Sequence, residues 1–256
     1  SSSGDPIGRS GNNGRVMNQI PLFAEKRMAS DPNNWAIIVP ILNEAGALPG
    51  LLDHLQYWQQ RGAEVVIADG GSNDASADMA REQGFTVIQA PRGRARQMNT
   101  GARASQACHL LFLHADTRLP TGADQRIRSA LGNESLAWGR FDVRIEGCSK
   151  MLPVIAWFMN RRSRLTGIST GDQALFMTRE AFESVGGFPD QPLMEDVEIS
   201  RRLKQTTPPV CLPEKVTTSG RRWDTRGSWH TIWLMWQLRW AYWRGTPAEQ
   251  LAERYR

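Results

Sequence analysis

The chain has 256 residues, of which 40% are hydrophobic and 22% are charged, and its formal net charge at pH 7 is +5. This composition is typical of a globular protein, and the length suits one large α/β domain or two small ones. The sequence contains no apolar run of about 18 residues, so we predict no membrane span of ordinary length. Its three cysteines are widely spaced and odd in number, which argues against a disulfide framework and favours a cytoplasmic location.

Residues 1–30 are rich in Ser, Gly, Asn and Arg and show no hydrophobic periodicity. We predict that they form a disordered tail, part of which could derive from an expression vector, and they lack the apolar core of a secretory signal. Arginine carries most of the positive charge of the chain, and its planar fork suits phosphate and carboxylate groups. Nucleic acid, anionic lipid and phosphorylated small molecules are compatible with this charge, and so is an arginine preference without functional meaning.

Short apolar runs alternate with helical segments between residues 35 and 120. The pattern predicts strands at the apolar runs, namely 35–40, 64–69, 85–89 and 108–113. It predicts helices between them, at about 41–60, 74–84 and 91–106. Strict alternation of strand and helix indicates an α/β fold with a mostly parallel central sheet and helices on both faces.

Polar side chains follow three of these strands, at Asn43 and Glu44, at Asp69 and at Asp116. In open α/β sheets the ligand binds beyond the carboxyl ends of the strands. Asp116 alone could equally cap the turn that follows it. Three polar strand ends on one edge favour a binding site.

The second half of the chain is less regular. Between Trp138 and Glu146, apolar and charged residues alternate from Phe141 onward, which predicts a strand with one solvated face. Helices are predicted near 121–131, at 151–159, from 194, at 228–244 and from 246, and strands at 171–177 and near 210. The acids Glu195 and Asp196 would lie in the first turn of the helix that starts at 194.

Four short motifs occur in a fixed order: Val39-Pro40-Ile-Leu-Asn43-Glu44, Ala68-Asp69-Gly-Gly-Ser-Asn-Asp74, His114-Ala-Asp116 and Glu195-Asp196. In this order they resemble the family 2 glycosyltransferases, which have the nucleotide-sugar-binding GT-A fold. The resemblance covers about residues 35–255 and implies a single GT-A-like domain over 35–256. Within it we expect a nucleotide-binding half at 35–120, an acceptor half at 121–227 and C-terminal helices at 228–256. Three further segments are similar to a bacterial soluble subgroup of the family: 171–173, 221–223 and 248–256.

The resemblance implies roles for several residues on the donor side. Asp69 matches the acid that contacts the nucleotide base, while Pro40, Asn43 and Glu44 lie on the loop that lines the nucleoside pocket. Arg94, or else Arg96, would hold the donor diphosphate. The implied donor is a nucleotide-diphosphate sugar, and nucleic acid is not an expected partner.

The resemblance also implies a divalent metal, Mn²⁺ or Mg²⁺. Asp116 matches the last acid of the family's Asp-x-Asp motif, which binds the metal on the donor diphosphate. The first acid of that motif is His114 in this chain, and imidazole can donate a hydrogen bond or ligate a transition metal. We also consider His230 as a metal ligand, with an ordinary helix-surface histidine as the alternative.

On the acceptor side, Asp196 matches the family's general base, and Glu195, Arg222 and Trp223 would lie near it. A base opposite the leaving group implies one in-line displacement with inversion at the anomeric carbon. Glu195 and Asp196 could instead be ordinary first-turn helix acids. The chain keeps only Arg222-Trp223 of the Gln-x-x-Arg-Trp motif of processive synthases, which favours transfer of a single sugar.

Three other functions fit the sequence less well. A dinucleotide-dependent oxidoreductase needs Gly-x-Gly-x-x-Gly after the first strand, and the turn at 40–46 has one glycine. A sugar nucleotidyltransferase would have a Gly-rich loop with lysine there. A basic module that binds membrane or nucleic acid without catalysis would explain the arginines, but not three polar strand ends.

Five tryptophans are spaced four, three, four and three residues apart on one face of the predicted helix at 228–244: Trp229, Trp233, Trp236, Trp240 and Trp243. This stripe could pack against the sheet as a core helix. Alternatively it could lie at a membrane surface, where tryptophan prefers the headgroup level. The second alternative predicts peripheral contact with the inner face of the membrane and a lipid-linked acceptor.

Overall fold

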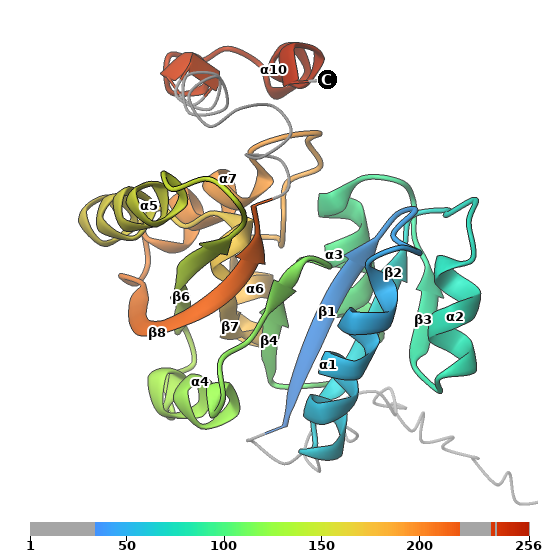
Figure 1. Ribbon diagram of the computed structural model, residues 1–256. Helices are drawn as coiled ribbons and strands as arrows, with labels where there is room; N and C mark the ends of the chain where they lie inside the picture. The colour runs from blue at the N-terminus through green and yellow to red at the C-terminus, as the bar shows by residue number, and fades with distance from the viewer. Residues whose placement is uncertain (1–33, 221–236, 239, 256) are drawn as a thin grey trace, which may run out of the picture. The chain divides into compact units, whose positions relative to one another are not determined.

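The computed structural model describes residues 34–220, 237–238 and 240–255. Eight strands form one sheet in the order β3-β2-β1-β4-β7-β6-β8-β5 (Figure 1). The first four strands and the helices between them are β1 (Trp35–Ile41), α1 (Leu48–Gln60), β2 (Glu64–Asp69), α2 (Ser76–Glu82), β3 (Thr86–Gln89), α3 (Arg94–Ala104) and β4 (His109–Phe112). The later elements are β5 (Thr117–Arg118), α4 (Ala123–Leu131), β6 (Trp138–Glu146), α5 (Leu152–Thr166), η2 (Gly171–Gln173), β7 (Phe176–Thr178), α6 (Arg179–Ser184), α7 (Glu195–Leu203), β8 (Val210–Ser219) and α10 (Ala248–Tyr255).

The strands β1 to β4 pair in parallel, with β1 between β2 and β4. Their apolar runs are buried on both faces, as expected for a parallel sheet with helices on either side. β7 joins this half to β6 through antiparallel pairing, and β6 then pairs in parallel with β8. The predicted α/β class with a mostly parallel central sheet is confirmed.

The two faces of the sheet carry separate apolar clusters. The helices α1, α4 and α5 pack on one face, with Leu52, Ile127 and Ile155 among the buried side chains. The helices α3, α6 and α7 pack on the other, with Met98, Phe182 and Ile199. The sheet therefore lies between two helical layers, and its strand ends remain available for a site.

The connection from β4 to β5 requires the sheet to curl. Three strands lie between β4 and β5 in the sheet order, yet only residues 113–116 join them. Crossing four strand spacings in a flat sheet takes about 19 Å, whereas five fully extended residue steps reach at most about 18 Å. A turn in which the Thr117 N–H donates to the His114 carbonyl, at 3.0 Å, shortens the connection further. His114 and Asp116 lie on this short segment.

Three local predictions were wrong. The first helix begins at Leu48 rather than near Ile41, because Asn43 has a φ of 54°, which a right-handed helix does not accommodate. Residues 171–177 do not form one strand: a 3-10 turn at Gly171–Gln173 precedes the short strand Phe176–Thr178. The helix predicted at 151–159 runs on to Thr166, and neither β5 nor α6 was predicted.

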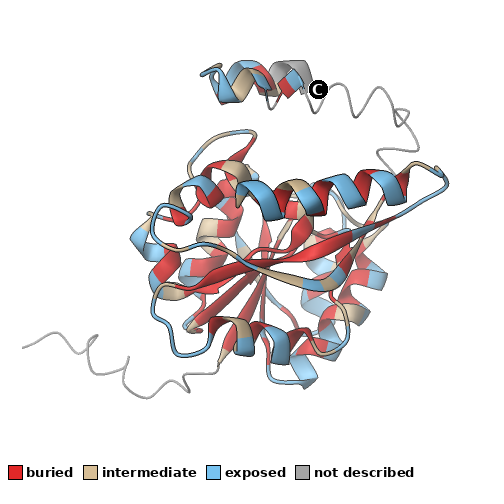
Figure 2. Cartoon of the chain, turned by 90° about the vertical axis from the view of Figure 1, so that its left-hand side faces the viewer, coloured by how far each residue is buried: buried red, intermediate tan, exposed pale blue. Residues whose placement is uncertain are grey.

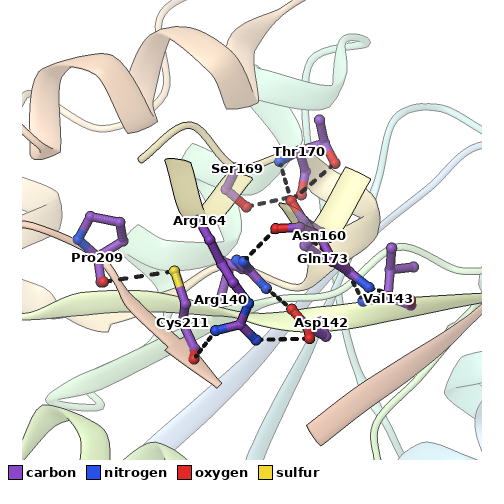
Figure 3. Close-up of polar contacts among 10 residues, drawn as sticks. All are labelled: Arg140, Asp142, Val143, Asn160, Arg164, Ser169, Thr170, Gln173, Pro209 and Cys211. Atoms are coloured by element: carbon purple, nitrogen blue, oxygen red, sulfur yellow. Dashed lines mark hydrogen bonds and ion pairs between the residues drawn. The ribbon is translucent and has the colours of Figure 1, made fainter. Parts of the chain in front are cut away.

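The solvated strand face predicted from Asp142, Arg144 and Glu146 was wrong at Asp142. Arg140 is fully buried and Asp142 nearly so, and the two form an ion pair. Figure 3 shows how this pair is surrounded: Arg164 donates to the other oxygen of Asp142 at 2.8 Å, and the Asn160 carbonyl accepts from Arg140 at 3.2 Å. Only Arg144 and Glu146 of the charged residues on this strand are exposed. The buried charges are tolerated because each has a charged partner.

Replacing Asp142 with alanine is expected to lower the free energy of unfolding by about 3–5 kcal/mol, because Arg140 would keep a buried charge without its carboxylate. Urea denaturation measures this loss. The matched control is Glu146→Ala on the same strand, which breaks the exposed 3.0 Å pair with Arg144 and should cost less than about 1 kcal/mol. Equal losses in the two variants would contradict the stabilising role of the buried pair.

His54 joins α1 to the segment after β5. Its Nε2 accepts hydrogen bonds from the Trp58 indole N–H at 3.1 Å and the Leu119 backbone N–H at 3.0 Å. Burial, with a contribution from the positive charge of Arg118, lowers the pKa of His54 from 6.5 to about 4. The folded state therefore holds the neutral imidazole.

Between about pH 6.5 and about pH 4 the unfolded chain binds a proton at His54 that the folded chain does not. Stability should therefore fall as the pH is lowered through this window, by about 1–3 kcal/mol once partial solvent access is allowed for. Thermal unfolding of the wild type and of His54→Gln checks this prediction. Glutamine keeps an acceptor but does not titrate, so an identical pH dependence of the two proteins would refute it.

Candidate active site

The loops after β1 and β2 are tied together by side-chain hydrogen bonds. The Asn43 N–H donates to Ser72 Oγ at 2.9 Å, and the Asn73 N–H donates back to Asn43 Oδ1 at 2.8 Å. The Ala45 N–H donates to Asp74 Oδ2 at 3.1 Å. These contacts hold Asn43 at positive φ and fix the course of the loop that begins at half-buried Pro40. Glu44 lies on the same loop, and its N–H donates to the Ser76 hydroxyl at 2.8 Å.

Asp69 ends β2 and is buried. Its Oδ1 accepts hydrogen bonds from the Ser72 hydroxyl at 2.6 Å and from the Ser72 N–H at 3.1 Å, so the carboxylate shapes the turn. Beneath the turn, Gln97 Nε2 donates to the carbonyls of Ile41 at 2.7 Å and of Ala68 at 2.9 Å. A side chain at Gly70 would come within 2.8 Å of Gln97, which explains the glycine there. Gln97 was not among the predicted site residues, because nothing in its own helix marks it.

Asp116 is exposed at the end of the β4–β5 connection. Its Oδ1 accepts a hydrogen bond from the Thr117 hydroxyl at 3.3 Å, and its backbone carbonyl accepts one from the Ser219 N–H at 3.2 Å. Among the described residues, no hydrogen bond reaches its Oδ2. The backbone therefore fixes the position of Asp116 while its carboxylate faces solvent.

His114 lies two residues earlier and contacts the 3-10 turn η2. Its Nδ1 is 3.3 Å from Asp172 Oδ1. Its ring packs against Gly171 so closely that any side chain there would collide with it. Asp172 was not among the predicted site residues. The only sequence signal for it is the Gly171-Asp172-Gln173 segment itself.

The N-terminus of α7 meets the same turn. The Gly171 N–H donates to Asp196 Oδ2 at 2.7 Å, and the Val197 N–H donates to Asp196 Oδ1 at 2.8 Å. Met194, just before the helix, adopts a positive φ of 64°. The half-buried Asp196 carboxylate is thus fixed in orientation, and each of its oxygens keeps a further lone pair.

Arg94 and Glu195 form an ion pair of 3.2 Å between α3 and α7. Burial raises the pKa of Glu195, and the positive charge of Arg94 offsets this only in part. Desolvation lowers the pKa of Arg94, but the negative charges of Glu195, Asp196 and Asp172 outweigh it, so the net shift is upward. Neutralising either partner would therefore disturb the other.

The helix α3 connects the two groups of predicted residues. Gln97 holds the carboxyl ends of β1 and β2, and Arg94, one turn earlier, holds Glu195. The structure thus brings Arg94, His114, Asp172, Glu195 and Asp196 into one cluster of charged side chains. Asp69 and Asn43 lie in the neighbouring pair of loops. The cluster thus places one guanidinium and one imidazole among three carboxylates.

The family model described as "Glycosyl transferase family 2" matches residues 36–186, which is more than half of the chain. The chain belongs to glycosyl transferase family 2. The matched stretch of this family 2 chain contains Asp69, His114 and Asp116, whereas Glu195 and Asp196 lie beyond it.

Curated relatives of the family 2 chain are glycosyltransferases. It is 32% identical over 107 residues to a 4,4'-diaponeurosporenoate glycosyltransferase of Staphylococcus haemolyticus, which covers 38% of the chain and 28% of that protein. It is 34% identical over 92 residues to a PGL/p-HBAD biosynthesis glycosyltransferase of Mycobacterium bovis, covering 33% of the chain and 36% of the relative. Over 238 residues it is 22% identical to a beta-monoglucosyldiacylglycerol synthase of Trichormus variabilis. This alignment covers 82% of the chain and 51% of the relative. The chain thus spans about a quarter to a half of the length of these relatives.

Solved structures share the fold. A mannosyltransferase of Pyrobaculum calidifontis, in complex with GDP-Man and Mn²⁺, superposes with a TM-score of 0.59 at 18% identity, over 86% of the family 2 chain and 66% of the other. TarS of S. aureus superposes with a TM-score of 0.57 at 15% identity, over 73% of the family 2 chain and 60% of the TarS chain. At this identity the likeness concerns the fold alone, and it supports the predicted GT-A-like architecture.

A divalent metal would need ligands from the chain or from its substrate. No group of three or more His, Cys, Asp or Glu side chains that could hold a metal lies among the residues described here. Mg²⁺ in nucleotide sites is commonly held by one or two carboxylates together with substrate phosphates and water. The exposed carboxylate of Asp116 fits such a site, which the donor would complete.

Several predictions concern residues outside the described ranges, namely Arg222, Trp223 and His230, and they stay predictions. Of the five tryptophans, only Trp240 and Trp243 are described, and their exposed fractions are 57% and 83%. These two side chains therefore do not pack into a core. None of the helices in the described part of the chain is both long and apolar enough to cross a bilayer.

Proposed function

We propose that this family 2 chain transfers one sugar from a nucleotide-diphosphate donor to an acceptor hydroxyl, with a divalent metal and with inversion at the anomeric carbon. The observation that carries this proposal is the linkage through α3. One helix supports the loop carrying Asp69 and also positions Arg94 against Glu195 at the start of α7. A donor-binding loop and an acceptor-side acid are thus held by one rigid element.

On the donor side, Pro40, Asn43, Glu44 and Asp69 would line the nucleoside pocket. The hydrogen bonds between the two loops support this role, because they fix the backbone before any ligand binds. The guanidinium of Arg94 would contact the diphosphate from its exposed side while it keeps its pair with Glu195. His114 would donate a hydrogen bond to the donor from the imidazole nitrogen that does not face Asp172.

At the leaving group, Asp116 would hold Mn²⁺ or Mg²⁺, which stabilises the negative charge that develops on the departing diphosphate. Its place beyond the end of a buried central strand supports this role, because backbone contacts fix it while its carboxylate is accessible.

On the acceptor side, Asp196 would be the general base and Glu195 would orient Arg94. The two N–H donors on Asp196 fix the orientation of its carboxylate, which supports this role, because a general base must present a lone pair to the acceptor hydroxyl. A base that attacks from the side opposite the leaving group gives one displacement and an inverted product. Glu195 is less suited to this role, because its carboxylate is buried and paired with Arg94.

The acceptor is proposed to be lipid-linked, and the protein is proposed to work in the cytoplasm at the inner face of the membrane. One relative is named as the synthase of a diacylglycerol lipid. Trp240 and Trp243, near the end of segment 228–244, are exposed, which is compatible with contact to a membrane surface. Arg222 and Trp223 are proposed to lie on this acceptor side.

Thermal shift assays test the proposed function. UDP-, GDP- and dTDP-sugars with Mn²⁺ should raise the unfolding temperature, because a ligand that binds only the folded state stabilises it. Heparin and DNA should not. Stabilisation by heparin or DNA, and by none of the nucleotide sugars, would favour the alternative of a non-catalytic basic module. Stabilisation by a nucleoside triphosphate and a sugar phosphate would favour a nucleotidyltransferase.

A further inference from the structure

The outer face of α5 exposes large apolar side chains. Val154, Trp157, Phe158 and Leu165 have exposed fractions of 43%, 55%, 62% and 76%. The rings of Trp157 and Phe158 touch edge to face, with centroids 4.9 Å apart. Trp157, Phe158 and Leu165 follow Val154 by three, four and eleven residues. On an α-helix these spacings put the four side chains on one face. We call this set of four residues the α5 apolar face.

The opposite face of α5 is already used by the core. Leu152, Ile155, Ala156 and Met159 are buried in the cluster between this helix and the sheet. The buried face fixes the rotation of the helix, so the α5 apolar face cannot turn inward. α5 lies on the left-hand side of Figure 1, which is the side that faces the viewer in Figure 2, where exposed segments are pale blue.

The stretch of chain that carries the α5 apolar face has charged residues of one sign. The stretch from Gly147 to Gly171 contains no Asp or Glu. It contains four basic residues: Lys150, Arg161, Arg162 and Arg164. Arg161 lies over the ring of Trp157, with its guanidinium carbon 5.7 Å from the ring centre. Arg164 forms an ion pair with Asp142, whereas the side chains of Lys150 and Arg161 are exposed to solvent.

We propose that the α5 apolar face docks on a bilayer surface that contains anionic lipid headgroups. A helix with Trp, Phe and Leu on its outer face and basic residues without acids beside them has the composition of an interfacial helix. Tryptophan prefers the headgroup level, and arginine pairs with the lipid phosphate while its stem stays in the apolar layer. A protein partner or a second copy of this chain would need acidic groups facing these cations.

Docking through α5 would place the bilayer next to the candidate acceptor site. α5 ends at Thr166, and only residues 167–170 separate it from η2. Within η2, the Gly171 N–H holds Asp196 and Asp172 contacts His114. None of the four residues of the α5 apolar face belongs to segment 228–244, and binding of vesicles by this face does not depend on the transfer reaction.

Flotation of the full chain with vesicles tests the proposal. The probes are vesicles of phosphatidylcholine alone and vesicles in which about a quarter of the lipid is phosphatidylglycerol. The wild type should float with the anionic vesicles at about 50 mM salt and much less at about 500 mM, because salt screens the charges. It should bind the neutral vesicles weakly.

The double variant Trp157→Ser, Phe158→Ser should bind the anionic vesicles about tenfold more weakly or worse, since two large exposed side chains lose their insertion. The matched control is Tyr57→Ser on α1, an exposed aromatic residue that also carries a guanidinium over its ring, that of Arg61. The control should bind like the wild type. A second pair of substitutions, Trp240→Ser with Trp243→Ser, measures any contribution from the C-terminal segment.

Three outcomes would overturn the proposal. The wild type could fail to bind anionic vesicles at low salt. The α5 variant, shown to be folded by circular dichroism, could bind as well as the wild type. The wild type could form a dimer in solution that the α5 variant does not, which would assign the face to a second copy. The thermal shifts with nucleotide sugars are independent of all three outcomes, so this proposal and the proposed function can fail separately.

Discussion

Replacing Asp196 with asparagine is expected to lower turnover by about 10²–10⁴-fold, with binding of the nucleotide donor retained. Asparagine has nearly the same shape but cannot accept the proton of the acceptor hydroxyl. It can still accept the hydrogen bond from the Gly171 N–H, so the contact between α7 and η2 can persist. Steady-state rates and calorimetry with the nucleoside diphosphate measure the two quantities separately.

The control for this variant is Asp78→Asn, which weakens an exposed ion pair of 3.0 Å with Arg81 on α2. It should leave turnover close to the wild-type value. Retained turnover in Asp196→Asn, or loss of donor binding, would exclude Asp196 as the base. NMR of the wild-type product should show an inverted anomeric centre.

Replacing Asp116 with alanine is expected to abolish the part of donor affinity that depends on the metal. A carboxylate at the end of the β4–β5 connection is the group proposed to hold Mn²⁺ or Mg²⁺ against the donor phosphates. The backbone carbonyl of Asp116, which accepts from Ser219, is kept in the variant, so the fold should be unchanged. Calorimetry with a nucleoside diphosphate, with and without Mn²⁺, measures the effect.

Asp78→Ala provides the control, because Asp78 is an exposed acid whose partner is Arg81, one turn away on α2. It should leave both affinities unchanged. If Asp116→Ala binds the nucleoside diphosphate as tightly as the wild type in the presence of Mn²⁺, Asp116 is not part of the donor site. If Mn²⁺ does not change the affinity of the wild type for the nucleoside diphosphate, the proposed role of the metal in donor binding is wrong.

The contacts around Asp196 explain why the site could be anticipated only in part. The sequence order of the motifs pointed to Asp69, His114, Asp116 and Asp196, because each follows a recognisable local pattern. Gln97 carries no such pattern, and the Gly171-Asp172-Gln173 segment did not single out Asp172 as a site residue. Their importance comes from partners that are far away in the chain, such as Asp172 with His114 and Gln97 with Ile41.

The amino-acid sequence by itself determined the α/β class, the four parallel strands from Trp35 to Phe112 and the family, because these depend on short-range periodicity and motif order. Only the tertiary structure decided which polar residues are buried and which side chains meet. Asp142 belongs to the alternating pattern of a solvated strand face, yet it is buried and pairs with Arg140 and with Arg164 of α5. Arg94 and Glu195 are 101 residues apart, and their pairing depends on the packing of α3 and α7 on one face of the sheet. Burial and long-range pairing are properties of how elements pack, and a local pattern of residues does not encode them.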